Sequence, residues 1–154
     1  MNIGIKEENR EAVSNRLQQL LADEFVLYTK TRNYHWNIEA ANFSELHSFY
    51  EEQYDELADI VDEVAERIRM LGQISSGSLR DFLKLTQLPE QDYTTSAKEQ
   101  LTNLVNDHDA IIRYLRECIT EFDETYKDIG SSDFVTGLMV RHEKMSWMLR
   151  SHQA

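Results

Sequence analysis

The sequence predicts an all-α protein, a four-helix bundle that forms a single domain over residues 1–154. Three observations lead to this prediction. Glycine and proline are scarce, with 5 and 1 residues, so the chain has little of the turn chemistry that many short strands require. Apolar residues recur every three or four positions along four long segments, which is the period of a helix with one buried face. A composition of 41% hydrophobic and 29% charged residues is typical of a globular domain.

The four long segments predict helices at about 6–37, 43–72, 96–127 and 133–150. Asn42 precedes the second helix in a capping pattern, with a glutamate three residues later. Gly72 is a plausible C-terminal cap for that helix. Ser96 repeats the capping pattern before the third helix, and Gly130 is expected to stop it.

The stretch between the second and third helices differs from the rest of the chain. It holds the only proline and a cluster of serine and glycine, and a short apolar piece within it predicts a small helix at about 78–85. Short joins make the first and last pairs of helices antiparallel, whereas this long connection lets the chain cross the bundle. This is the layout of a ferritin-like four-helix bundle, with an extra helix between helices 2 and 3.

The chain is strongly acidic, with 16 basic and 28 acidic residues and a formal net charge of -12. Such a surface repels nucleic acid and attracts cations. Cys118 is the only cysteine, so no disulfide can form within the chain and a reducing compartment is expected. The first residues show no apolar signal core, and no apolar run approaches membrane-spanning length. We therefore expect a cytoplasmic protein with no membrane partner.

Histidines and carboxylates gather in the first half of the chain. Asp62 and Glu66 are four residues apart and share one face of the second helix. His47 lies fifteen residues before Asp62, near the same face but roughly 22 Å away along the helix. Two copies of this helix, antiparallel about a two-fold axis, would bring His47 of one chain to the carboxylates of the other. His35, at the end of the first helix, could swing into the same site.

The predicted ligand set is thus two imidazoles from one subunit and two carboxylates from its partner. Mixed nitrogen and oxygen ligands suit Fe(II), and also Zn(II) or Mn(II). The alternative is an ordinary solvated acidic face, because pairs of acids four residues apart are common on helices. In that interpretation Tyr34 and Trp36 only pack at a helix end.

Several stretches of the sequence closely resemble the Dps family of mini-ferritins, whose name stands for DNA-binding protein from starved cells. They are NYHWN at 33–37, FSELHSFYEEQYDEL at 43–57, VDEVAERIRMLG at 61–72 and HEKMSWMLRS at 142–151. The resemblance runs from about residue 10 to residue 151. It implies a hollow homo-oligomeric shell of twelve subunits that oxidises Fe(II), often with hydrogen peroxide, and stores Fe(III) mineral. It also implies protection against oxidative damage.

The resemblance extends to individual residues of the predicted metal site. His35, His47, Asp62 and Glu66 match the ferroxidase ligand positions of the family, and Trp36 matches the tryptophan beside the centre. Trp36, with Tyr34 as a second candidate, could supply or absorb a stray electron. No Glu-x-x-His motif occurs, so a ferritin-type centre inside one bundle is not expected.

The remaining histidines carry no metal prediction. His108 falls on the apolar stripe of the third helix and is expected in the core or at an interface. His142 and His152 show no partner pattern, so both are expected to be structural.

The turn before the fourth helix, EFDETYKDIGSSDF at 121–134, is rich in acids. It corresponds to the region that lines the three-fold pores of the family, through which iron enters. Asp128 and Asp133 are the main candidates for pore residues, and Glu124 is the third. The alternative is a solvated loop in which Asp133 or a nearby serine caps the helix.

Direct binding to DNA is expected to be weak or absent. Residues 1–16 balance Lys6, Arg10 and Arg16 against three glutamates, and the last residues, SHQA, form no basic arm. The alternative functions are a nucleoid-binding structural protein of the same fold and a helical interaction module without metal. The preferred oxidant, peroxide or oxygen, does not follow from the sequence.

Overall fold

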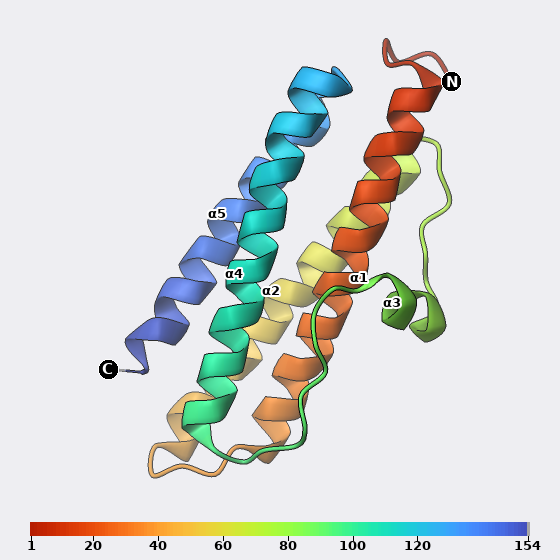
Figure 1. The fold of residues 1–154 in the computed structure, drawn as a ribbon. Coiled ribbons are helices and arrows are strands. Elements are labelled where there is room, and N and C mark those ends of the chain that lie inside the picture. The colour runs from red at the N-terminus through yellow and green to blue at the C-terminus, as the bar shows by residue number, and fades with distance from the viewer. Residues whose placement is uncertain (154) are drawn as a thin grey trace.

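A computed structural model describes residues 1–153 as four long helices lying side by side, with a short helix on the outside (Figure 1). The elements are α1 (Glu7–Asn37), α2 (Phe43–Met70), α3 (Leu79–Leu85), α4 (Ala97–Thr120), the π-helical turn η1 (Glu121–Thr125) and α5 (Ile129–Ser151). The described residues contain no strand, only an isolated bridge between Glu39 and Ser96. The all-α prediction is confirmed.

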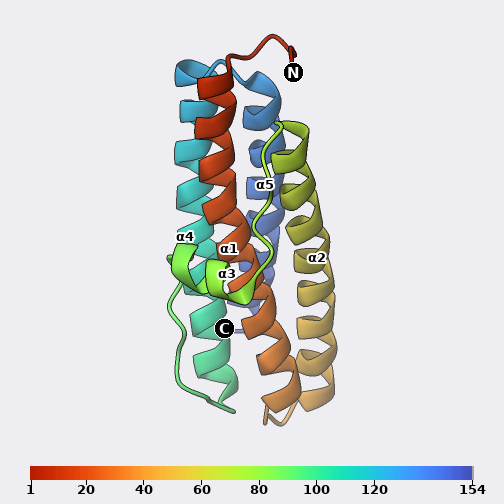
Figure 2. The ribbon, with the colours of Figure 1, turned by 90° about the vertical axis from the view of Figure 1, so that its right-hand side faces the viewer.

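The helices pair as two antiparallel hairpins, α1 with α2 and α4 with α5 (Figure 1). The connection from α2 to α4 runs along the length of the bundle and carries α3, which packs against α1 (Figure 2). This crossing starts α4 at the end of the bundle where α1 finishes, so α4 runs antiparallel to α1. The predicted ferritin-like layout, with its extra helix in the long connection, is confirmed.

The core lies between the four long helices, where the apolar stripe of each helix meets the others. Burying one large side chain of this kind contributes about 1.5–3 kcal/mol. The largest fully buried side chains are Tyr50, Phe122, Leu17, Leu20, Leu21, Leu27, Leu46, Leu57, Ile60, Ile68, Leu71 and Leu104.

Two of the predicted helix ends form as expected, and a third forms without its side-chain contact. Gly72 follows α2 with φ at +91°, a conformation in which a side chain would be strained. Ser96 caps α4 by accepting a hydrogen bond from the backbone N–H of Glu99. Asn42 stands at the start of α2, but its side chain makes no capping hydrogen bond.

The start of the last helix differs from the prediction. α5 begins at Ile129 rather than at residue 133, and Gly130 lies in its first turn instead of stopping α4. The chain leaves α4 through the π-helical turn η1 and reverses at Lys127, whose φ is +56°. The carboxylate of Asp128 then caps α5 by accepting a hydrogen bond from the backbone N–H of Ser131 at 3.0 Å. An aspartate cap before the glycine allows the helix to start earlier than the glycine suggested.

None of the helices within residues 1–153 is long and apolar enough to cross a membrane.

Candidate metal centre

His35 and His47 lie against each other where the hairpin of α1 and α2 turns. His35 is in the last turn of α1, and His47 is near the start of α2. Their rings stack with centroids 3.7 Å apart and planes 19° from parallel. Phe43 also stacks on His47, with centroids 5.0 Å apart. The fold therefore brings the two predicted imidazoles together within one chain.

Reciprocal hydrogen bonds hold the two rings. Nδ1 of His35 lies 2.7 Å from the backbone oxygen of His47, and Nδ1 of His47 lies 2.8 Å from the backbone oxygen of His35. A carbonyl oxygen can only accept, so each Nδ1 carries the hydrogen and donates it. In a neutral imidazole the lone pair is then on Nε2. Metal-binding histidines commonly have this arrangement, in which the hydrogen bond at one ring nitrogen orients the other toward the metal.

An aromatic and cationic cluster lies beside His35. The ring of Tyr54 meets that of His35 edge-to-face, with centroids 5.2 Å apart, and its hydroxyl donates to Glu51 at 3.1 Å. The guanidinium of Arg32 lies over the rings of Tyr54 and Trp36, at 4.7 Å and 5.6 Å from their centroids. Trp36 is itself 64% exposed. Arg32 therefore connects the rings of Trp36 and Tyr54, and the ring of Tyr54 in turn contacts that of His35.

Asp62 and Glu66 lie further along α2, on an exposed face. Among residues 1–153, neither side chain has a hydrogen-bond or ion-pair partner. Other acids of α2 are neutralised, because Arg141 of α5 binds Glu56 at 2.5 Å and Glu63 at 2.8 Å. Burial alone would lower the pKa of Arg141, but the hydrogen bonds to these carboxylates raise it. Contact with α5 thus neutralises Glu56 and Glu63 but leaves the two predicted ligands, Asp62 and Glu66, unpaired in the described subunit.

The imidazole pair and the carboxylate pair stand apart in one chain. α2 is an unbroken helix of 28 residues, so His47 and Asp62 are roughly 22 Å apart along it. Within the described chain, no three histidine, cysteine, aspartate or glutamate side chains come together in a way that could hold a metal ion. The length of α2 is the physical reason.

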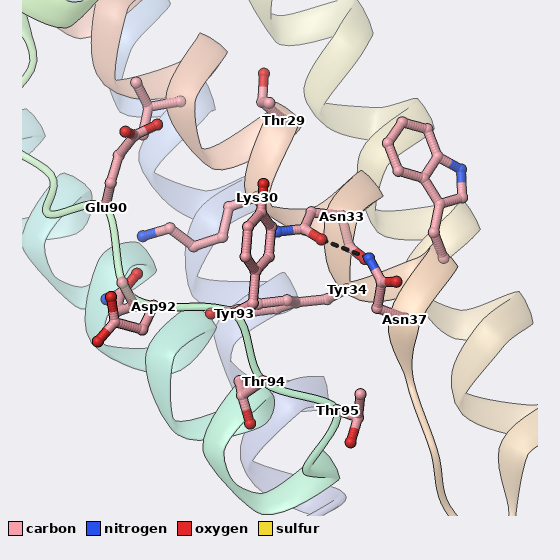
Figure 3. A pocket seen from close by; sticks show the side chains of 13 residues that line it. Thr29, Lys30, Asn33, Tyr34, Asn37, Glu90, Asp92, Tyr93, Thr94 and Thr95 are labelled. Carbon is pink, nitrogen blue, oxygen red and sulfur yellow. Dashed lines mark hydrogen bonds between the residues drawn. The ribbon is translucent and has the colours of Figure 1, made fainter.

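A cleft of about 1000 Å³ lies between the second half of α1 and residues 90–95 of the connection (Figure 3). Asn37 donates to Asn33 at 2.7 Å on its α1 wall. Tyr34 lies against the same cleft, and its hydroxyl accepts a hydrogen bond from Asn103 of α4 at 2.8 Å. Of the predicted metal ligands and Trp36, only Trp36 lines this cleft. Neither His35 nor His47 lines the cleft, and Tyr54, not Tyr34, is the tyrosine whose ring contacts the ring of His35.

Known proteins share both this sequence and this fold. Residues 14–154 match the family model of the ferritin-like domain. The chain is 37% identical over 149 residues to the DNA protection during starvation protein of Porphyromonas gingivalis, covering 97% of this chain and 93% of that protein. The solved structure of the Dps protein from Vibrio cholerae covers 100% of this chain and 97% of its own, with a TM-score of 0.94 and 31% identity. This chain belongs to the Dps family of ferritin-like proteins.

Two other relatives of this Dps-family chain are informative. An uncharacterised low temperature-induced protein of a Nostoc species is 43% identical over 152 residues, which are 98% of this chain and 85% of that protein. DpsC from Streptomyces coelicolor has a TM-score of 0.96 at 25% identity, covering 100% of this chain and 90% of its own. The Vibrio protein is described as a member of the ferritin-like diiron-carboxylate superfamily. The resemblance seen in the sequence is confirmed at the level of the family.

The three acidic residues predicted to line a pore take different positions in this Dps subunit. Glu124 and Asp133 are exposed at the end of the bundle where α4 passes into α5. Asp128 is only 2% exposed, and its carboxylate binds the backbone and hydroxyl of Ser131 and the guanidinium of Arg67 at 3.4 Å. Asp128 is therefore a buried helix cap in the subunit, and we do not include it among the pore residues proposed below.

Sequence reasoning missed two groups of residues. Tyr54 could have been found, since it lies seven residues, about two helical turns, after His47 and so on the same side of α2. The second group is a buried contact between His142 and both His108 and Glu24. Glu24 lies within the apolar stripe of α1, and an acid at a core position was the available signal.

Proposed function

We propose that this Dps protein oxidises Fe(II) to Fe(III) at sites shared between subunits and stores the product in a hollow shell. One observation carries the proposal. His35 and His47 are stacked, and both leave Nε2 free because each Nδ1 donates to the other residue's backbone oxygen. Two oriented imidazoles with free Nε2 atoms form part of a metal site, which needs further ligands from elsewhere.

Asp62 and Glu66 of a neighbouring subunit are the proposed further ligands. Two copies of α2 that pack antiparallel about a two-fold axis place His47 of one subunit opposite the Asp62 and Glu66 of the other. Because such a contact is self-complementary, every pair of subunits forms two equivalent sites. The absence of partners for both carboxylates within the described subunit supports this role.

The donor set suits iron as a substrate. Neutral imidazoles and carboxylates bind Fe(II), and hard carboxylate oxygens favour the more highly charged Fe(III) product. Zn(II) and Mn(II) accept similar ligands, so we expect them to compete. Hydrogen peroxide is the proposed oxidant, with oxygen as the alternative. One peroxide takes two electrons, one from each of two Fe(II) ions, so no hydroxyl radical needs to be released.

Trp36 is proposed to protect the site when oxidation goes astray. Its indole lies over the guanidinium of Arg32, which also covers Tyr54 beside His35. A one-electron oxidant formed at the histidines could draw an electron from this cluster instead of escaping.

The subunit has apolar surface that an assembly would cover. Large apolar side chains are at least 45% exposed on the outer faces of α2, α3 and α5. Packing against other subunits would remove such side chains from water, which is favourable. They support the proposed homo-oligomer, for which the family resemblance implies twelve subunits. These side chains are Phe43, Met70, Leu79, Leu83, Ile129, Val140 and Trp147.

Iron would enter the proposed shell past Glu124 and Asp133. Both carboxylates are exposed at one end of the bundle, beside the turn that joins α4 and α5. A ring of such carboxylates attracts cations.

Anaerobic loading with Fe(II) followed by a pulse of hydrogen peroxide tests the proposed function. Wild type should form Fe(III) rapidly, without hydroxyl radical, and retain it in the assembled protein. The His47→Ala/Asp62→Ala variant should lose most of this rate, because each site then lacks a ligand from both subunits.

The His152→Ala/Asp92→Ala variant is the matched control. It removes another histidine and another exposed aspartate, neither of which is a proposed ligand, and it should retain the wild-type rate. Size-exclusion chromatography and circular dichroism confirm that all three proteins fold and assemble alike. Equal rates in wild type and the His47→Ala/Asp62→Ala variant would reduce the four residues to an acidic helix interface.

A further inference from the structure

Three ionisable side chains, called the buried triad below, are linked by close polar contacts in the middle of the bundle. Nε2 of His142 on α5 lies 2.8 Å from a carboxylate oxygen of Glu24 on α1. Nδ1 of the same ring lies 2.9 Å from Nδ1 of His108 on α4. Glu24 and His142 are 0% exposed, and His108 is 1% exposed. The triad thus joins three of the four long helices through the core.

Other buried charges near the triad are Asp23 of α1, which is next to Glu24, and the ion pair of Lys30 with Asp107, which is next to His108. The buried positions of α2 hold no Asp, Glu, Lys, Arg or His. On α5, Arg150 contributes to lowering the pKa of His108, and it is bound to Asp109 of α4 at 2.5 Å. The second carboxylate oxygen of Glu24 has no hydrogen-bond partner within the described residues. Because Lys30 and Arg150 are each paired with an aspartate, the protonation of the triad is decided mainly by its own members and by the neighbouring Asp23.

The two contacts within the triad limit how many protons its three side chains can hold. Each contact needs one hydrogen, located between a donor and an acceptor. With Glu24 ionised, His142 can donate from both ring nitrogens, and His108 then accepts at Nδ1 and keeps its hydrogen on Nε2. If the proton between Glu24 and His142 is bound to Glu24 instead of Nε2 of His142, the number of protons on the triad is the same. Three protons satisfy both contacts and leave the triad with no net charge, whereas two protons also satisfy both contacts but leave a net negative charge in the core, which burial disfavours.

A fourth proton has no place in this geometry. It would put hydrogens on both sides of one contact, for example on both Nδ1 atoms at 2.9 Å. It would also leave a net positive charge in the buried core. Burial, the neighbouring His142 and the positive Arg150 all lower the pKa of His108 well below its ordinary value of 6.5. The folded bundle therefore resists a proton that the opened bundle accepts.

A metal site is a poorer explanation of these residues. Glu24 and His108 contact opposite edges of the His142 ring, so the three side chains do not converge on one point. They are not among any metal-capable group in residues 1–153. Glu24 is also eleven residues before His35, about 16 Å along α1, so the triad is separate from the proposed iron site.

We propose that Glu24, His142 and His108 form an acid-sensitive lock, which ties α1, α4 and α5 together at neutral pH and opens when the core takes up a fourth proton. At a pH well below 6.5, the ordinary pKa of an imidazole, the opened state binds one more proton than the closed state. Its relative population then rises about tenfold per pH unit. The lock does not depend on the proposed iron chemistry.

Hydrogen–deuterium exchange on the assembled protein tests the lock. Peptides covering 104–112 of α4 and 138–146 of α5 are followed from pH 7.5 to 5.0 and corrected for intrinsic exchange rates. Below pH 6.5 their protection should fall about tenfold per pH unit in wild type. In His108→Asn the amide oxygen can still accept from His142 but cannot titrate, so this dependence should vanish. His152→Asn is the matched control and should behave as wild type.

Protection that stays constant with pH in wild type, or falls equally in His108→Asn, would overturn the proposal. A measurement on unmodified protein covers the case in which His108→Asn does not fold. Exchange of the ring Cε1 hydrogen, read by mass spectrometry, reports each histidine separately. The ratio of the His108 rate to the His152 rate should rise about tenfold per pH unit below 6.5. A constant ratio would also reject the lock.

Discussion

The chemistry of His35 and His47 depends on which ring nitrogen each of them leaves free. Both use Nδ1 to donate to a backbone oxygen of the other, so the two bonds fix both tautomers at once. A histidine in the core has a different role. His142 uses both ring nitrogens in buried contacts, which leaves it no free lone pair for a metal. The hydrogen bonds thus distinguish the two candidate ligands, which keep a free ring nitrogen, from the core histidine, which does not.

Replacing Trp36 tests its protective role at the scale of one residue. Trp36→Phe should keep the rate of iron oxidation, since no ligand changes, but release several-fold more hydroxyl radical during a peroxide pulse. Spin-trap electron paramagnetic resonance measures the radical, and absorbance measures Fe(III).

Trp147→Phe is the matched control, because Trp147 is also 64% exposed but lies on α5, away from Arg32 and Tyr54. It should leave the radical yield unchanged. An unchanged yield in Trp36→Phe would remove the indole from the mechanism.

Single elements are positioned by polar contacts at their ends. Arg67 of α2 binds the hydroxyl of Ser131 at 3.0 Å and the carboxylate of Asp128 at 3.4 Å, so one guanidinium fastens the start of α5 to α2. Gly130 lies beside this contact, and a side chain there would come within 3.1 Å of Arg67. The early start of α5 therefore depends on the cap, the arginine and the small residue together.

Removing the cap should destabilise the bundle. Asp128→Ala leaves the N–H of Ser131 and part of Arg67 without a partner, and we expect the free energy of unfolding to fall by about 1–3 kcal/mol. Urea unfolding followed by circular dichroism, at equal protein concentration, measures the loss.

Asp133→Ala provides the comparison from the same turn. Asp133 is exposed and does not cap α5, so its removal should change stability by less than about 0.5 kcal/mol. Equal losses in the two variants would show that the cap of Asp128 contributes nothing beyond a general surface effect.

For the whole molecule, the length of α2 separates the two ligand pairs and makes the proposed site a property of the assembly. A site shared across a two-fold axis predicts complementation. In a mixed pair of His47→Ala and Asp62→Ala subunits, one site loses both kinds of ligand and the other is intact.

Unfolding and reassembling equal amounts of the two inactive variants should therefore restore activity. Half of the pairs are mixed and half of their sites are intact, so about a quarter of the wild-type rate is expected. The iron oxidation rate after peroxide addition measures it. The two variants mixed without reassembly are the control and should stay inactive. No recovery after reassembly would argue against ligands from different subunits.

The net charge of the whole molecule bears on DNA. The formal charge is -12, and basic residues near the start of the chain are already engaged, since Arg16 binds Glu121 at 2.9 Å and Arg10 is buried. We expect no gel shift of duplex DNA at physiological salt. A shift at moderate salt that disappears as salt rises would favour the nucleoid-binding alternative. Without binding, any protection of DNA would come from removing iron and peroxide.

The sequence by itself determined the helical class, the layout of the bundle and the family. These follow from local signals, namely the three-to-four periodicity, the scarcity of glycine and proline, and the motifs around His35 and His47. It also showed that His47 and Asp62 are too far apart to bind one ion, because the rise of a helix is the same in every protein. The ligand roles of His35, His47, Asp62 and Glu66 are also predictions from the sequence, which the iron oxidation assays test.

Only the tertiary structure decided the roles that depend on partners distant in sequence. The carboxylate of Asp128 binds Arg67, sixty-one residues away, and no local pattern in the sequence showed this contact. His142 showed no pattern in the sequence because its partners are 34 and 118 residues away, on two other helices. A hydrogen bond has a reach of about 3 Å, and which groups come within it is decided only when the helices pack.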